Sequence, residues 1–218
     1  MDTCFVMRHL EKAITYATEQ HSGASRKGSD IPYIAHPLEA LAIAAGITSD
    51  HEVLAAAVLH DVVEDTPATM DDIKEMFGER VAELVASDSE DKMLDLPPSE
   101  SWKARKEATI NFLQTATDDE KIIVLADKLA NIRALHRDII SHGDSVWERF
   151  NQKDKKMHEW YYRAIAYAVI DLSEHLAYQE LCRLIDMVFG GMPPYNQIKG
   201  VVLQISMGRR TMGIICLL

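Results

Sequence analysis

Hydrophobic residues recur every three or four positions along most of the chain, which is the spacing that gives a helix one apolar face. The first such stretch covers residues 3–20, where the apolar positions are Phe5, Val6, Leu10, Ala13, Ile14 and Ala17. Alanine and leucine recur throughout, and long stretches contain no glycine or proline, a composition that favours helix over sheet. The pattern therefore predicts an all-α fold.

Capping residues, prolines and glycines divide the rest of this pattern into separate helices. Pro37 favours a helix start because its missing N–H would lack a partner there in any case. Thr66-Pro67 stops the next helix, and Thr69 opens a capping-box sequence for the one that follows. After residue 20, the predicted helices cover residues 37–46, 50–65, 70–77, 79–89, 100–116, 118–140 and 153–189. We expect a helical bundle of roughly eight to ten helices.

The character of the chain changes at Gly190. The segment GGMPPYNQIKG is rich in turn residues, and VVLQISMGRRTMGIICLL is apolar and β-branched. We expect one domain over residues 1–189, followed by a linker and tail over residues 190–218 to which no chemistry is assigned. The tail is predicted to form a short hairpin or to dock on the domain, and its apolar residues leave a homo-oligomer open as an alternative.

Charge and cysteine content exclude several classes of protein. The formal net charge is −11 and the isoelectric point is near 5.2, whereas binding to a nucleic-acid backbone needs a basic surface. No apolar run approaches the roughly 20 residues that span a bilayer, and the charged N-terminal segment lacks the apolar core of a signal peptide. Three scattered cysteines give neither a disulfide framework nor a CxxC metal site. We expect a cytoplasmic protein that binds neither nucleic acid nor membrane.

Four titratable groups interrupt a very apolar predicted helix, in the stretch LAAAVLHDVVEDT. Residues four apart share a helix face, so His60 lies near Glu64 and Asp61 near Asp65. Left unpaired against a core, such groups would cost several kcal/mol each, and a divalent cation would remove that cost. Imidazole and carboxylate together are the ligand set of Mn²⁺, Fe²⁺, Zn²⁺ or Co²⁺. The alternative is that HDVVED is simply the solvated end of a helix.

Two other segments carry groups that suit the same ion. His36 sits at a helix start in PYIAHP, and Asp127 directly follows the apolar run IIVLA. A carboxylate in that position is expected to be partly buried and to need a cation or hydrogen-bond donors. Asn131, four residues later, shares its helix face. Two imidazoles and two carboxylates from three helices would leave positions open for water and substrate.

Four ordered motifs resemble those of a known family. They read RKGSDIPYIAHP, AAAVLHDVVEDT, DIKEMFGERVAELV and ADKLANIRAL. Over about residues 5–180 the chain resembles the HD-domain metal-dependent phosphohydrolases, and within that family the RelA/SpoT-type hydrolase domain. With no further domain expected after residue 190, it resembles the single-domain members, the small alarmone hydrolases.

This resemblance implies a reaction and a role for each group. One Mn²⁺ ion would be held by the four ligands His36, His60, Asp61 and Asp127. The ion would polarise a phosphoryl oxygen and lower the pKa of a bound water, while Glu64 and Asp65 would position water or carry protons. The substrate implied is guanosine tetra- or pentaphosphate, cleaved at the ribose 3′-pyrophosphate to give GDP or GTP and pyrophosphate.

Basic side chains must offset the charge of such a substrate, because residues 50–91 contain thirteen acidic residues against only Lys74 and Arg80. The resemblance assigns substrate binding to Arg26, Lys27, Lys92, Arg105 and Asn131, with Lys106 beside them. The alternative for the basic residues is that they lie on a solvated surface. The alternative for Tyr33 is core packing, and the same holds for the aromatic residues in the segment GDSVWERFNQKDKKMHEWYYRA. Two other functions stay open: hydrolysis of another nucleotide, such as an adenine alarmone, NADPH or a deoxynucleotide, and a module that senses a nucleotide without cleaving it.

Overall fold

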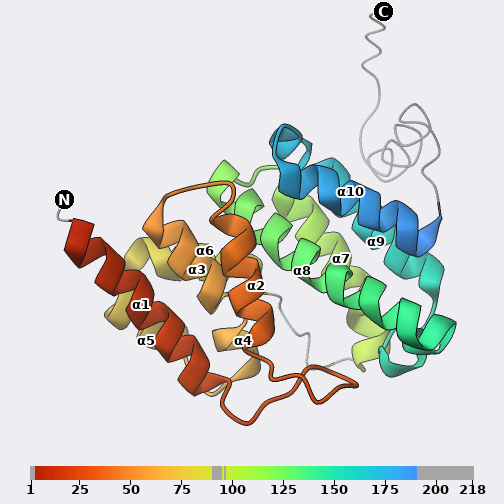
Figure 1. Ribbon diagram of the computed structural model, residues 1–218, viewed down its shortest axis with the longest axis horizontal. Coiled ribbons are helices and arrows are strands. Elements are labelled where there is room, and N and C mark those ends of the chain that lie inside the picture. Colours follow the sequence, from red (N-terminus) through yellow and green to blue (C-terminus); the bar gives the residue numbers. More distant parts are fainter. Residues whose placement is uncertain (1–2, 90–94, 96, 191–218) are drawn as a thin grey trace, which may run out of the picture.

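The computed structural model describes residues 3–89, 95 and 97–190. These residues form helices joined by short loops (Figure 1), and this part of the chain contains no β-strand, only an isolated bridge between Ser25 and Pro32. The all-α prediction is confirmed. No helix within these ranges has the length and apolarity needed to cross a membrane. Lys92 and the predicted tail after Gly190 lie outside the described residues.

The helices follow the order that the sequence pattern indicates, with additional breaks. In chain order they are α1 (Thr3–Gln20), α2 (Ala35–Ala44), α3 (His51–Leu59), α4 (Val62–Asp65), α5 (Met70–Phe77), α6 (Glu79–Asp88), α7 (Pro98–Leu113), α8 (Asp118–His142), α9 (Lys155–Ala168) and α10 (Leu176–Phe189). Two 3₁₀ helices, η1 (Gly143–Arg149) and η2 (Ile170–Leu172), complete the described elements.

The long helix α8 runs through the middle of the bundle. It packs against α2 on one side and against α10 on the other (Figure 1), and its run from Lys121 to Asp127 is buried throughout. A capping box fixes where this helix begins, since the Thr117 hydroxyl accepts from the Glu120 N–H and the Glu120 carboxylate accepts from the Thr117 N–H. The cap and the packing together place Asp127 inside the bundle.

The helix α3 is buried from Val53 to Leu59, because α1, α2, α6 and α8 all pack against it. Three consecutive alanines, residues 55–57, keep its surface narrow, so that the surrounding helices can approach it closely. Asp50 caps its first turn by accepting from the Glu52 N–H. The far end of this helix therefore lies inside the bundle, where charged side chains need partners.

The predicted helix over residues 50–65 is wrong in one respect, because it is broken at His60 and Asp61. Asp61 adopts φ −90° and ψ −7°, a conformation typical of turns. The His60 ring bonds the carbonyl of Ala57, one turn earlier, and so competes with the backbone ladder at the helix end. The stretch contains no glycine or proline, so periodicity alone did not reveal the break.

The predicted helix over residues 153–189 is also wrong, since it divides into α9, η2 and α10. Val169 leaves the helical conformation with φ −103° and ψ 23°, and His175 is extended just before α10. No glycine or proline marks a stop in this range. The change of direction lets α10 pack against both α8 and α9, so tertiary packing overrides the local helix preference.

Candidate metal centre and adjoining cavity

Four side chains that are far apart in the sequence converge inside the bundle. They are His36 in the first turn of α2, His60 and Asp61 between α3 and α4, and Asp127 in α8. His36 Nε2 lies 3.2 Å from His60 Nε2 and 3.1 Å from Asp127 Oδ1. Asp61 Oδ2 lies 3.3 Å from His36 Nε2 and 3.1 Å from His60 Nε2. His36, His60 and Asp127 are buried, and Asp61 is partly buried.

Hydrogen bonding leaves an unprotonated ring nitrogen facing this centre. The Ala57 carbonyl lies 2.9 Å from His60 Nδ1 and can only accept, so Nδ1 carries the proton of the neutral ring and Nε2 keeps a lone pair. The neighbours of His60 Nε2 are the second ring nitrogen and two carboxylate oxygens. Lone pairs gathered in this way repel one another unless a cation lies among them.

The pKa values of these groups show the same need for positive charge at the centre, which a proton on His60 can also meet. Burial alone would lower the pKa of His60, but Asp61 and Asp127 outweigh burial and raise it well above its usual range. Burial alone would raise the pKa of Asp127, but Lys128 and the two histidines hold it well below its usual range. His60 and His36 outweigh burial in the same way and lower the pKa of Asp61. A metal ion would therefore meet ionised carboxylates and would compete with the proton of His60.

The distances fit a single divalent cation. Nitrogen and oxygen ligands bind such ions at about 2.0–2.2 Å, so ligand atoms around one ion lie about 3 to 3.5 Å apart. His36, His60 and Asp127 each offer a ligand atom, and these atoms all lie within 4.8 Å of one another. Asp61 lies at a similar distance from both rings. His36, His60 and Asp127 thus suit a divalent metal, and Asp61 adds a second carboxylate beside the two rings, outside that group of three.

Glu64 and Asp65 stand on α4, directly after the Asp61 carboxylate. The Tyr33 hydroxyl lies 2.7 Å from Asp65 Oδ2 and 2.7 Å from Asp61 Oδ2, and the two carboxylates share its single proton as acceptors. Glu64 is partly buried on the same short helix, and Asp65 is exposed. Tyr33 is therefore more than the packing residue that one interpretation of the sequence suggested, because it connects two of the predicted site residues.

Arg26 and Asn131 lie beside the centre and are bonded to each other. Arg26 Nη2 donates to Asn131 Oδ1 over 2.6 Å, and Asn131 Nδ2 donates to Asp127 Oδ1 over 2.5 Å. The Arg26 guanidinium also lies 5.4 Å from the centre of the Tyr33 ring, within the range of a cation–π contact. A chain of polar contacts therefore links the loop before α2 to Asp127.

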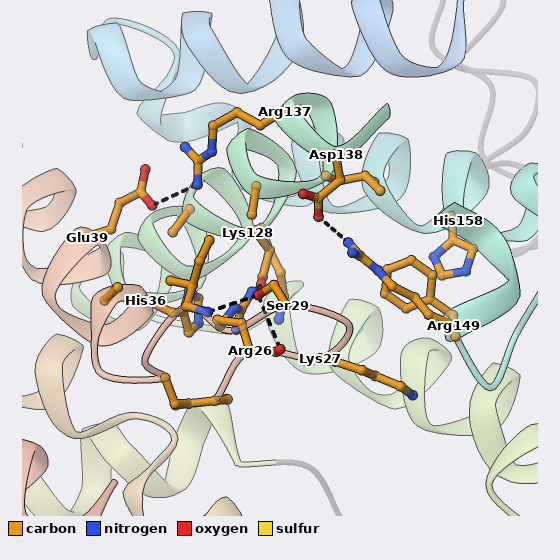
Figure 2. Close-up of a pocket in the computed structure, with 18 of the residues that line it drawn as sticks. Arg26, Lys27, Ser29, His36, Glu39, Lys128, Arg137, Asp138, Arg149 and His158 are labelled. Atoms are coloured by element: carbon orange, nitrogen blue, oxygen red, sulfur yellow. Dashed lines mark hydrogen bonds and ion pairs between the residues drawn. The ribbon is translucent and has the colours of Figure 1, made fainter. Parts of the chain in front are cut away.

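A cavity of about 390 Å³ extends from His36 along α8 toward η1 (Figure 2). Three of the predicted substrate residues line it, namely Arg26, Lys27 and Asn131. Arg105 is not among the described residues that line the cavity, although the adjacent Lys106 is. The predicted contact from Lys92 falls outside the described residues. The cavity therefore brings together only part of the predicted substrate set.

Several residues that were not assigned to the site from the sequence also line the cavity, among them Lys128, Arg149 and Tyr161. Lys128 forms an ion pair with Asp127, its neighbour in the chain, and that adjacency was the available signal. Arg149 comes from η1, pairs with Asp138 and lies at the end of the cavity away from His36 (Figure 2). Arg149 and Tyr161 fall in the aromatic segment interpreted as core, and Tyr161 is indeed only 4% exposed.

Asp88, at the end of α6, is another acidic group near the centre. Burial raises the pKa of Asp88 to about 7; the charge of Lys128 opposes this shift, and the charges of Asp127 and Asp61 reinforce it. Nothing in the sequence distinguished Asp88 from the many other acidic residues in the range 50–91.

Comparison with known proteins gives a family match that includes all four motifs. A family model described as HD domain matches residues 13–154. The chain is 37% identical over 131 residues to the bifunctional (p)ppGpp synthase/hydrolase SpoT of Escherichia coli, a match that covers 59% of this chain and 18% of SpoT. It is 38% identical over 127 residues to the guanosine-3′,5′-bis(diphosphate) 3′-pyrophosphohydrolase of Aquifex aeolicus, covering 58% and 18% of the two chains. The chain therefore spans less than a fifth of the length of these relatives.

Two solved structures are similar over nearly their whole length. One is described as a metazoan ortholog of SpoT that hydrolyses ppGpp and plays a role in starvation responses; it is 28% identical, with a TM-score of 0.64 and coverage of 84% of this chain and 97% of that one. The other is lmo0812 from Listeria monocytogenes EGD-e, 34% identical, with a TM-score of 0.62 and coverage of 72% and 96%. The helical arrangement is thus shared with two proteins whose solved chains match this chain over almost all of their length.

Proposed function

The chain belongs to the HD-domain family, and on this premise we propose that it is a metal-dependent hydrolase that removes the 3′-pyrophosphate from guanosine tetraphosphate (ppGpp) or pentaphosphate. The products are GDP or GTP and pyrophosphate. One observation carries the proposal: two imidazoles and two carboxylates converge beside a cavity lined by basic side chains. The substrate is suggested by the names of similar proteins, which describe action on (p)ppGpp.

We propose Mn²⁺ as the ion that this centre holds. Its ligands are His36 Nε2, His60 Nε2, Asp61 Oδ2 and Asp127 Oδ1. Imidazole and carboxylate ligands without thiolate suit Mn²⁺. When bound, such an ion polarises a phosphoryl oxygen and lowers the pKa of a water molecule.

The reaction requires one proton to be removed and one to be supplied. The oxygen of water bonds to the phosphorus attached to the ribose 3′-oxygen, the bond from that phosphorus to the 3′-oxygen breaks, and the 3′-oxygen takes a proton. Glu64 and Asp65 follow Asp61 by one helical turn, and we assign to them the acceptance of the proton of the attacking water and its transfer to the 3′-oxygen. Tyr33 bonds Asp65 and so restricts where that carboxylate points.

The cavity offers the positive charge that the substrate needs. Arg26, Lys27, Lys106, Lys128 and Arg149 all line it, although the chain as a whole carries a net charge of −11. Gathering cations in a partly enclosed cavity strengthens their attraction for phosphate groups, because less water screens them. A guanidinium plane such as that of Arg26 can also stack on a purine base. The proposed substrate therefore fits the charge of the cavity.

Purified protein, incubated with Mn²⁺ and ppGpp, should release GDP and pyrophosphate, which ion-exchange chromatography and ³¹P NMR identify. His60→Ala removes one proposed ligand and should reduce release to the uncatalysed background. His142→Ala is the matched control, because His142 is exposed at the end of α8 and should leave turnover unchanged. Replacing ppGpp in the same assay by its adenine analogue or by NADPH measures which nucleotide the protein prefers. Failure of the wild-type protein to release pyrophosphate from ppGpp would contradict the proposal.

A further inference from the structure

The hydroxyl of Tyr33 joins two carboxylates that the proposed function uses for different purposes. It lies 2.7 Å from Asp61 Oδ2, a proposed metal ligand, and 2.7 Å from Asp65 Oδ2, a proposed proton acceptor. A phenol has one proton to donate, so the two carboxylates share a single donor. The hydroxyl thereby holds two carboxylates close together that would otherwise repel each other.

The Asp61 oxygen that receives this hydrogen bond is also the oxygen that faces the metal centre. Asp61 Oδ2 lies 3.3 Å from His36 Nε2 and 3.1 Å from His60 Nε2. A carboxylate oxygen has more than one lone pair, so Oδ2 can accept from Tyr33 on one side and serve as a ligand on the other. A hydrogen bond from this hydroxyl restricts where Asp61 Oδ2 points.

The Tyr33 ring is itself held in place. Its centre lies 4.7 Å from the His21 ring centre and 5.4 Å from the Arg26 guanidinium, and 6.1 Å from the centre of the His36 ring, to which it is nearly perpendicular. Its backbone N–H donates to the Ala24 carbonyl over 2.9 Å, which closes the loop that carries Arg26. A phenol has an ordinary pKa of about 10, so the hydroxyl carries a proton to donate at neutral pH. A ring held at this many points gives its hydroxyl a fixed direction.

We propose that Tyr33 is a positioning residue of the metal centre, whose hydroxyl aims Asp61 Oδ2 at the cation and keeps Asp65 at a fixed distance from it. The inference rests on the proposed function, since it takes the four ligands as a metal site. It adds a mechanical connection, because the same residue touches Arg26 of the proposed substrate loop. Tyr33 thus contacts the substrate loop through Arg26, the proposed metal ligand Asp61 and the proposed proton acceptor Asp65.

Tyr33→Phe tests this inference because it removes the hydroxyl and keeps the ring. Mn²⁺ affinity, measured on the whole protein by electron paramagnetic resonance of the free ion, should weaken about 10- to 100-fold, the usual effect of removing a group that orients a ligand. The kcat for ppGpp at saturating Mn²⁺ should fall, because Asp65 loses its hydrogen bond, whereas KM should change less than kcat. Tyr16→Phe is the matched control, since Tyr16 packs on Phe77 away from the centre and should leave both quantities unchanged.

Two results would overturn the inference. Mn²⁺ affinity and kcat of Tyr33→Phe equal to those of the wild-type protein would show that the hydroxyl positions nothing. A wild-type protein that binds no Mn²⁺ would overturn the metal site and this inference together. The affinity measurement contains no nucleotide, so a wild-type protein that binds Mn²⁺ without cleaving ppGpp would contradict the proposed substrate alone, and the comparison of Tyr33→Phe with wild type would still decide the role of Tyr33.

Discussion

Single residues in this centre have partners on two sides. Asn131 accepts from Arg26 and donates to Asp127, which an amide can do at once because it carries both a carbonyl and an NH₂ group. His60 bonds the Ala57 carbonyl through Nδ1 and faces the carboxylates through Nε2. In both residues, the hydrogen bond on one side fixes the orientation of the side chain and so determines which atom faces the partner on the other side. The residue types at these positions are therefore restricted more by geometry than by charge.

Arg149 gives a prediction at this scale. Its side chain lines the far end of the cavity, pairs with Asp138 and packs on the loop at Gly28, where an added Cβ would lie 3.0 Å from Arg149 Cδ. Arg149→Ala should raise KM for ppGpp by about one to two orders of magnitude, because a hydrogen bond to a charged group contributes about 1.5–3 kcal/mol. Steady-state kinetics measures this change, and kcat should change less than KM.

Arg163→Ala serves as the control for that experiment. Arg163 also forms ion pairs, with Glu159 and Asp186, but it is not among the described residues that line the cavity. Its substitution should leave KM unchanged. Equal KM values for Arg149→Ala and the wild-type protein would show that Arg149 makes no contact with the substrate.

The sequence predicted site residues where the chemical signal is strong, and it gave no signal for groups whose position depends on the fold. Histidines and carboxylates inside apolar runs marked His36, His60, Asp61 and Asp127, because such groups need partners when buried. Tyr33 and Arg149 have no such signal, since a tyrosine or an arginine near aromatic residues is equally at home in packing or on a surface. Their place in the cavity became visible only when loops distant in the sequence were brought together.

At the scale of elements, the site depends on where helices begin and end. The break between α3 and α4 presents His60 and Asp61 at a turn, and the first turn of α2 presents His36. Helix starts were predicted well, because caps and prolines are local signals. The ends at residues 59 and 168 were not, because they are set by side-chain bonding and by packing between helices. Local sequence therefore predicted the elements better than it predicted their breaks.

The capping box of α8 provides the prediction at this scale. Thr117→Ala removes the hydroxyl that accepts from the Glu120 N–H, and it should lower the free energy of unfolding by about 1 kcal/mol. Urea denaturation followed by circular dichroism measures this difference. Thr115→Ala is the control, because its hydroxyl donates to the Phe112 carbonyl at the end of α7 and accepts no hydrogen bond at the start of α8. If both variants lost the same stability, the capping box would have no particular importance for α8.

At the scale of the whole molecule, metal binding and folding should be coupled. The proposed ligands come from α2, the α3–α4 junction and α8, so one ion would connect segments separated by about ninety residues of chain. Binding at 100 times the dissociation constant should stabilise the folded state by about 2.7 kcal/mol. Thermal denaturation with Mn²⁺ should therefore show a higher midpoint than denaturation with a chelator. In His60→Ala the difference should disappear, and its persistence there would mean that the ion binds elsewhere.

Crystals grown with Mn²⁺ would test the central proposal most directly, through the anomalous scattering of the ion. We predict a single strong peak within bonding distance, about 2.0–2.2 Å, of His36 Nε2, His60 Nε2, Asp61 Oδ2 and Asp127 Oδ1. A fully loaded crystal with no peak among these four atoms, or with its strongest peak at another place in the molecule, would contradict the proposal that they form a metal centre.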